Sequence, residues 1–163
     1  LVLISEDGAL VGVMTETGRA LSKPSGAGFV AQNWLENDGD GADQAQAAAR
    51  WSNIVADGIA KYDLGKLKLL HIQGERALSQ FTGCEQDDIV ISNTVLPTGL
   101  RCLVLDMKKL SHTGATALIS DPKGLRLLSV RDVAGQRMWH GLPRGHDARP
   151  QDQYVLINPT SLP

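Results

Sequence analysis

The chain has 163 residues, a hydrophobic content of 42%, a charged content of 21% and a formal net charge of −2. This length and composition fit one globular domain with a sizeable core, and they exclude a disordered chain. The charge is uneven, because residues 1–100 hold 7 Lys/Arg against 13 Asp/Glu, whereas residues 101–149 hold 9 against 4. The basic later part could steer a polyanion, and the alternative is ordinary solvated surface charge.

Short apolar runs separated by glycine-containing turns predict a β-meander at the start of the chain. These runs occupy residues 1–4, 10–14 and 19–22. Residues 29–35 place Phe29 and Trp34 near one helical face, which predicts a short helix. An acidic, glycine-rich loop at 36–43 is followed by the alanine-rich residues 42–51, which we predict to be helical.

Residues 54–62 are ambiguous, but after them predicted strands alternate with predicted helices. The strands lie at 66–72, 88–92, 101–106, 115–119 and 125–130, and the helices at 75–81 and 107–113. This alternation favours an α/β layered domain, with β-hairpins and short helices packed on a mixed sheet. We expect the domain to cover residues 1–141, because from Leu142 onwards Pro, Gly, Arg and Asp replace the apolar spacing. Residues 142–163 are therefore predicted to form a C-terminal tail.

The sequence contains no apolar stretch of the roughly 20 residues that a transmembrane helix needs. No signal peptide is visible, since the chain opens directly on the strand-like residues 1–4. We therefore expect a fragment of a longer protein.

The histidines give no metal-binding motif. His71, His112, His140 and His146 are never spaced as H-x-H or H-x-x-x-H, the spacings that bring two imidazoles onto one metal. We interpret His71, in an apolar run, as a core histidine, and His112 as a helix-end residue favoured by the dipole. The sequence thus predicts no catalytic residue, no metal and no cofactor.

Other motifs fail on closer inspection. The loop that begins at Asp38 resembles part of a calcium loop, but positions 5 and 12 are Ala42 and Ala49, where oxygen ligands are required. A loop whose Asp43 caps the next helix is the better interpretation. Residues 26–31 fit G-x-G-x-x-A, but the acidic residue that a dinucleotide site needs after the next strand is missing.

Several short segments occur in an order that is similar to one known family. They are residues 8–13, 18–22, 29–35, 38–40, 83–84, 88–92, 101–106 and 110–115. Over roughly residues 1–140 this ordered set resembles the C-terminal soluble domain of alphaproteobacterial ComEC-family DNA-uptake proteins.

The resemblance implies a fold and a process. ComEC proteins are inner-membrane channels that admit single-stranded DNA during natural transformation. Many carry a C-terminal metallo-β-lactamase-like domain thought to degrade the strand that is not transported. That family holds metals with H-x-H-x-D-H and later His/Asp ligands, and this sequence departs from the pattern at every ligand. The resemblance therefore implies a truncated or degenerate metallo-β-lactamase-like α/β domain, without nuclease residues.

We accordingly predict a non-catalytic soluble domain of a ComEC-type inner-membrane channel, on the extracytoplasmic side, with a role in DNA handling or assembly. Its partners would be single-stranded DNA, the membrane-embedded remainder of the same polypeptide and the competence machinery. One alternative is a metal-dependent nuclease whose missing ligands come from elsewhere in the full-length protein. The other is a protein-interaction module without DNA affinity.

The two cysteines, Cys84 and Cys102, could be buried thiols or one bridge. If the strands that follow them are neighbours, the two residues lie at similar heights. The resemblance also places the domain outside the cytoplasm, where a bridge persists, so we predict a disulfide.

Any DNA contact is expected on the basic later part of the chain. The candidates are Arg101, Lys108, Lys109, Lys123, Arg126 and Arg131. Binding through such residues would be weak, non-specific and salt-dependent. No aromatic residue lies between Leu100 and Arg137, so base stacking should contribute little.

Overall fold

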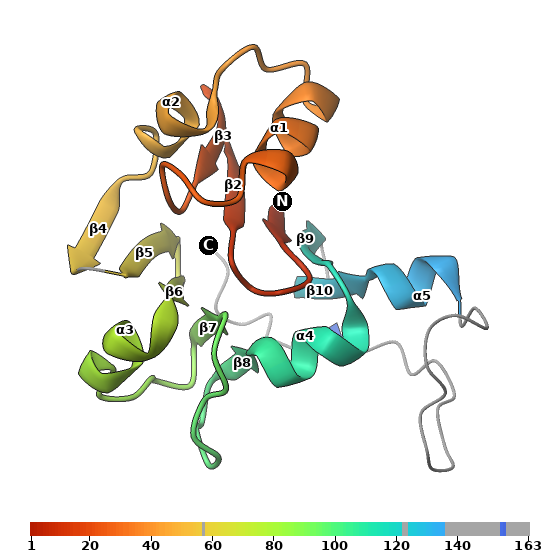
Figure 1. Cartoon of the computed structure of the whole chain (residues 1–163). Helices are drawn as coiled ribbons and strands as arrows, with labels where there is room; N and C mark the ends of the chain where they lie inside the picture. The colour runs from red at the N-terminus through yellow and green to blue at the C-terminus, as the bar shows by residue number, and fades with distance from the viewer. Residues whose placement is uncertain (57, 122–123, 136–153, 156–163) are drawn as a thin grey trace.

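The structure is a computed structural model that describes residues 1–56, 58–121, 124–135 and 154–155. Its strands form two sheets (Figure 1). Sheet A has the strand order β11-β10-β9-β1-β2-β3, and sheet B has the order β4-β5-β6-β7-β8. The domain is therefore α/β, with short helices added to one antiparallel and one mixed sheet.

Sheet A joins the beginning of the chain to its later part, and all its pairs are antiparallel. Its strands are β1 (Val2–Ile4), β2 (Val11–Thr15), β3 (Gly18–Leu21), β9 (Thr116–Asp121), β10 (Gly124–Ser129) and β11 (Tyr154–Val155). β1 lies at the junction, because Val2 pairs with Val13 of β2 on one side and with Leu118 of β9 on the other. The predicted meander is thus confirmed, and a later hairpin extends it.

Sheet B is mixed. Its strands are β4 (Asn53–Ala56), β5 (Ile59–Leu64), β6 (Leu67–Ile72), β7 (Asp88–Ser92) and β8 (Leu103–Leu105). The first three are antiparallel neighbours, whereas β7 and β8 run parallel to β6. Helix α3 (Gly74–Gln80) makes the connection that the parallel pair β6–β7 requires.

An apolar layer fills the space between the sheets. Sheet A contributes Ile4 and Leu118, and sheet B contributes Leu69 and Ile91, all at most 1% exposed. Successive residues of a strand point to opposite faces, so each sheet turns alternate apolar side chains inward. Helix α4 (Met107–Thr113) adds Leu110 to the same layer.

Other helices cover part of each outer face. Helices α1 (Gly28–Asn37) and α2 (Gln44–Ala48) pack Leu35 and Ala47 on Leu10 and Leu21, at the β2–β3 end of sheet A. On sheet B, α3 packs Ala77 on Ile72 and Val90. The result is a layered arrangement of two inner sheets with helices outside, as Figure 1 shows.

The structure resolves one ambiguous segment and corrects two local predictions. The ambiguous residues 54–62 are two strands, β4 and β5, with a register shift between Ile54 and Ala56. The alanine-rich helix is shorter than predicted and ends at Ala48. The predicted strand 125–130 ends at Ser129, because its hydroxyl accepts the backbone N–H of Asp132 and begins helix α5 (Val130–Ala134).

Of the predicted tail, residues 142–163, the structure describes only β11, where Val155 pairs with Leu125 of β10. In the described part of the chain, every helix is too short or too polar to traverse a bilayer.

Candidate functional site

Cys84 and Cys102 form a disulfide, with their Cα atoms 5.8 Å apart. Cys84 lies in the loop before β7, and Cys102 directly precedes β8. These strands are parallel neighbours, with Ile89 opposite Leu103, so the two cysteines lie at the same edge of sheet B. The predicted pairing is therefore present, for the reason given by the strand order.

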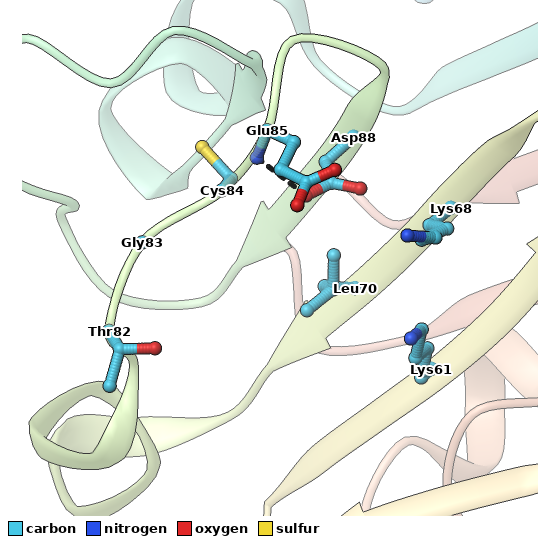
Figure 2. Close-up of a pocket in the computed structure, with 8 residues that line it drawn as sticks. All are labelled: Lys61, Lys68, Leu70, Thr82, Gly83, Cys84, Glu85 and Asp88. Carbon is cyan, nitrogen blue, oxygen red and sulfur yellow. Dashed lines mark hydrogen bonds between the residues drawn. The ribbon is translucent and has the colours of Figure 1, made fainter.

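Beside this disulfide, the outer face of sheet B carries a polar depression of about 430 Å³. It is lined by Lys61, Lys68, Leu70, Thr82, Gly83, Cys84, Glu85 and Asp88 (Figure 2). Lys61 of β5 is the register partner of Leu70 of β6, and Lys68 lies two residues before Leu70, so all three share one face. The apolar contacts of α3 lie around Ile72 and Val90, which leaves this end of the face open.

The walls of the depression carry opposite charges. Lys61 is half-buried and Lys68 is exposed, and neither makes an ion pair within the described residues. Asp88 is only 8% exposed, and its Oδ2 accepts the backbone N–H of Glu85 at 2.7 Å. Figure 2 shows the two lysines along one side of the depression and the carboxylates of Glu85 and Asp88 on an adjacent side, nearer Lys68 than Lys61.

A second polar group is buried between the sheets. His71 of β6 lies 2.8 Å from the carbonyl of Gly8 through Nε2 and 2.8 Å from Ser22 Oγ through Nδ1. A carbonyl only accepts, so Nε2 carries the proton and Nδ1 accepts the hydroxyl proton of Ser22. Ser22 Oγ in turn accepts the backbone N–H of Val11 at 3.0 Å. Burial lowers the pKa of His71 to about 4, so the imidazole is neutral at pH 7.

This serine–histidine contact has the heavy-atom distance of a nucleophile and its base. It is, however, closed to a substrate, because Ser22 is 4% exposed and His71 is fully buried. All its polar atoms are used to join sheet A and the β1–β2 turn to sheet B. The interpretation of His71 as a hydrogen-bonded core histidine is therefore confirmed.

The acidic loop after α1 is bound by arginines. Arg19 of β3 is 1% exposed and makes a bidentate pair with Asp38, at 2.5 Å through Nε and 2.9 Å through Nη2. Arg50 pairs with Asp40, and its guanidinium holds the pKa of that carboxyl below its usual range. These carboxylates are thus engaged by guanidinium groups, and the buried arginine was not recognised in the sequence.

The cap predicted at Asp43 is confirmed. Its side chain accepts the backbone N–H of Gln46 at 2.8 Å, and the Gln46 side chain accepts the N–H of Asp43 at 2.9 Å. This reciprocal pair begins α2 and fixes where the acidic loop ends.

Three of the predicted DNA-contacting residues lie on the neighbouring helices α4 and α5. Lys108 is exposed and Lys109 is half-buried on α4. Arg131 of α5 donates from Nη2 to the carbonyl of Ser111 at 3.0 Å, which places its guanidinium beside the end of α4. We call Lys108, Lys109 and Arg131 the basic cluster. His112 is exposed at the end of α4 with Nδ1 2.7 Å from the carbonyl of Lys108, which fits a helix-end residue.

The remaining candidates are not shown to join this cluster. Arg101 is exposed in the loop before β8. Arg126 is half-buried on β10 opposite Ile119, and its Nε has no hydrogen-bond partner within the described residues. Lys123 lies outside the described residues.

An apolar depression of about 290 Å³ lies over β1, β9 and β10. Leu3, Ala117 and Leu128 line it together with Trp34 of α1 and Val133 of α5. Val133 is 71% exposed. This site was not predicted, because helix α5 was not predicted, although Ser129 and Asp132 give the S-x-x-D signal of a helix start.

Within the part of the chain that the structure describes, no group of three His, Cys, Asp or Glu side chains is arranged to hold a metal ion. Comparison of the chain with models of protein families, with curated proteins and with solved structures finds no match.

Proposed function

We propose that this chain is a non-catalytic, soluble domain of a ComEC-type inner-membrane DNA-uptake channel, on the extracytoplasmic side, and that it contacts single-stranded DNA. The observation that carries this proposal is the basic cluster, in which the Arg131–Ser111 hydrogen bond places a guanidinium against α4, the helix that carries the two lysines. The two facing sheets with outer helices agree with the layered arrangement expected of a degenerate metallo-β-lactamase-like domain.

The cluster fits a phosphate backbone better than a base. Lys108 is exposed, and Lys109 and Arg131 are half-buried, so their charged ends are accessible to a phosphate. Residues 101–135 contain no Phe, Trp or Tyr side chain that could stack on a base. Neutralising three phosphates of a single strand predicts a slope of about −2 for the logarithm of the association constant against the logarithm of salt concentration. Such binding is non-specific and steeply salt-dependent.

The test is titration of a labelled single-stranded oligonucleotide at low and at physiological salt. The triple variant Lys108→Glu, Lys109→Glu, Arg131→Glu should lose at least about tenfold in affinity at low salt. The matched control reverses the same number of charges elsewhere, with Lys66→Glu, Lys68→Glu and Arg76→Glu, and should bind almost as well as the parent. Equal losses in both variants, or binding that ignores salt, would contradict this assignment of the surface.

The apolar depression favours a second function, a protein-interaction module. Val130 and Val133 are 48% and 71% exposed, which is unusual for neighbouring valines on one short helix. Under this function, Val133→Asp should weaken association with the membrane-embedded remainder of the polypeptide and leave DNA binding unchanged. Co-purification of the two parts, expressed separately, measures the effect.

The nuclease alternative has its own measurement. Near-stoichiometric zinc or manganese, found by elemental analysis of protein purified without added metal, would favour that alternative over the proposed function.

A further inference from the structure

We propose that the polar depression on sheet B binds a small zwitterion, a free amino acid or a short peptide. Its carboxylate would contact Lys61 and Lys68, and its ammonium group would contact Glu85 and Asp88. This site is lined by β5, β6 and the loop before β7, and it shares no residue with the basic cluster, so the inference is independent of the proposed function.

The cationic side of the depression lacks an internal partner. Lys68 is the register partner of Asp63 on β5 and of Asp88 on β7, yet neither carboxylate lies within 4.0 Å of its ammonium group. Lys61 likewise has no ion pair in the described parts of the chain. Two ammonium groups on one face repel each other, and an anion placed between them removes that repulsion. A carboxylate is small enough to accept from both.

The acidic side is fixed in place. Asp88 Oδ2 is engaged by the backbone N–H of Glu85 at 2.7 Å, and the carbonyl of Glu85 accepts the N–H of Asp88 at 3.1 Å. These two bonds leave Asp88 Oδ1 without a protein donor among the described residues. The Glu85 carboxylate is exposed beside it. Together they supply acceptors for an ammonium group, whose donors are all charge-assisted.

The mixed charge sets the ligand class. A simple anion would meet the repulsion of Glu85 and Asp88, and a simple cation would meet that of the lysines, whereas a molecule carrying both charges satisfies both sides. The volume of about 430 Å³ is at the small end of ligand sites, and Leu70 offers an apolar floor for a short side chain.

The disulfide holds one wall of this site. Thr82, Gly83 and Cys84 belong to the loop between α3 and β7, and the Cys84–Cys102 bond ties that loop to the start of β8. Binding should therefore weaken when the bond is reduced, because the Glu85 side of the depression loses its fixed distance from the lysines.

The experiment is a titration of the full chain, followed by amide NMR shifts, with alanine, with dialanine and with N-acetylalanine amide. We expect millimolar binding of at least one zwitterion and none of the blocked compound, and the first two ligands distinguish a free amino acid from a peptide. The variant Lys61→Met, Lys68→Met and the variant Glu85→Gln should each lose about tenfold or more, as expected for a lost charge-assisted contact. Lys66→Met and Arg76→Met, at exposed positions outside the depression, together form the matched control and should bind like the parent.

Absence of saturable shifts with both zwitterions up to about 50 mM would overturn the proposal, because binding weaker than this is not specific. Equal binding of acetate and of alanine would also overturn it, because the acidic side would then play no part. The lysines and Glu85 line the surface and lack structural partners, so their variants should remain folded, and unchanged amide spectra away from the depression verify this.

Discussion

The outer face of sheet A buries a charged side chain in an ion pair, whereas the outer face of sheet B places charged side chains beside an open depression. On sheet A, Arg19 is 1% exposed, covered by the α1–α2 layer and bound at two points by Asp38. On sheet B, α3 covers only part of the face, and Lys61 and Lys68 lie beside an open depression without ion pairs in the described residues. The charge of Arg19 stabilises the fold, whereas Lys61 and Lys68 remain available to a ligand.

The largest expected effect comes from removing the buried arginine on sheet A. Arg19→Met removes a guanidinium and leaves Asp38, whose side chain is 18% exposed, without its partner. Breaking a buried pair on one side costs about 3 to 5 kcal/mol, so we expect a loss of about 4 kcal/mol in the free energy of unfolding. Chemical denaturation measures it. A loss under about 1 kcal/mol would show that the pair behaves as a surface ion pair.

The next largest effect concerns the disulfide beside the depression on sheet B. Replacing both cysteines, Cys84→Ala and Cys102→Ala, releases a loop closed over a sequence separation of 18. The chain-entropy model gives a destabilisation of about 3 kcal/mol for a loop of this size. Thermal unfolding of the double variant should match that of the reduced parent protein. A reduced parent as stable as the oxidised one would contradict the prediction.

A smaller effect on stability comes from His71, which is buried between the two sheets. The folded-state pKa of His71, about 4, lies below its unfolded value of about 6.5, so the unfolded chain binds the proton more strongly. Stability from this group is complete above about pH 6.5 and declines as the pH falls toward about 4, by about 2 kcal/mol between pH 6.5 and 5. Urea denaturation across this range measures the slope.

The control for that slope is His112→Gln, which removes an exposed histidine and should leave the slope in place. His71→Asn should flatten the slope while lowering stability at pH 7. The chosen range avoids Asp7 and Asp40, because their lowered pKa values make their stabilisation disappear only at lower pH.

The smallest expected effect comes from the two lysines beside the depression on sheet B. Lys61→Met and Lys68→Met should change the free energy of unfolding by less than about 0.5 kcal/mol each, because neither side chain makes an ion pair in the described structure. The same denaturation assay that detects Arg19→Met provides the contrast. A loss near that of Arg19→Met would mean that these lysines serve the fold.

The elements with strong periodic patterns were predictable. Residues 89–91 form an apolar run within a strand, 88–92, that is buried along its whole length, and the helix at 107–113 has the same bounds in the structure. Residues 54–62 were not predictable, because β4 is an edge strand whose pairing shifts register and whose residues follow no simple alternation. Local pattern cannot specify such a strand without its neighbour β5.

The sites were harder to predict than the fold. The cysteine pairing followed from the order of two strands, but Arg19 is a charged residue at a fully buried position, and only its contact with Asp38 explains it. Similarly, Lys61, Lys68 and Asp88 meet across three strands of a mixed sheet. Strand order is a tertiary property, so a reading of one segment at a time does not bring these residues together.

The double pairing of β1 has a consequence for how the chain acquires its structure. One neighbour of Val2 is Val13, and the other is Leu118, which is synthesised much later. Until that second neighbour is present, β1 is an open edge and the inner face of sheet A is incomplete. Contacts of such long sequence separation slow folding, because the intervening chain must be confined before they are gained. We therefore expect cooperative folding late in synthesis, with the nascent N-terminal meander exposed to proteases until β9 arrives.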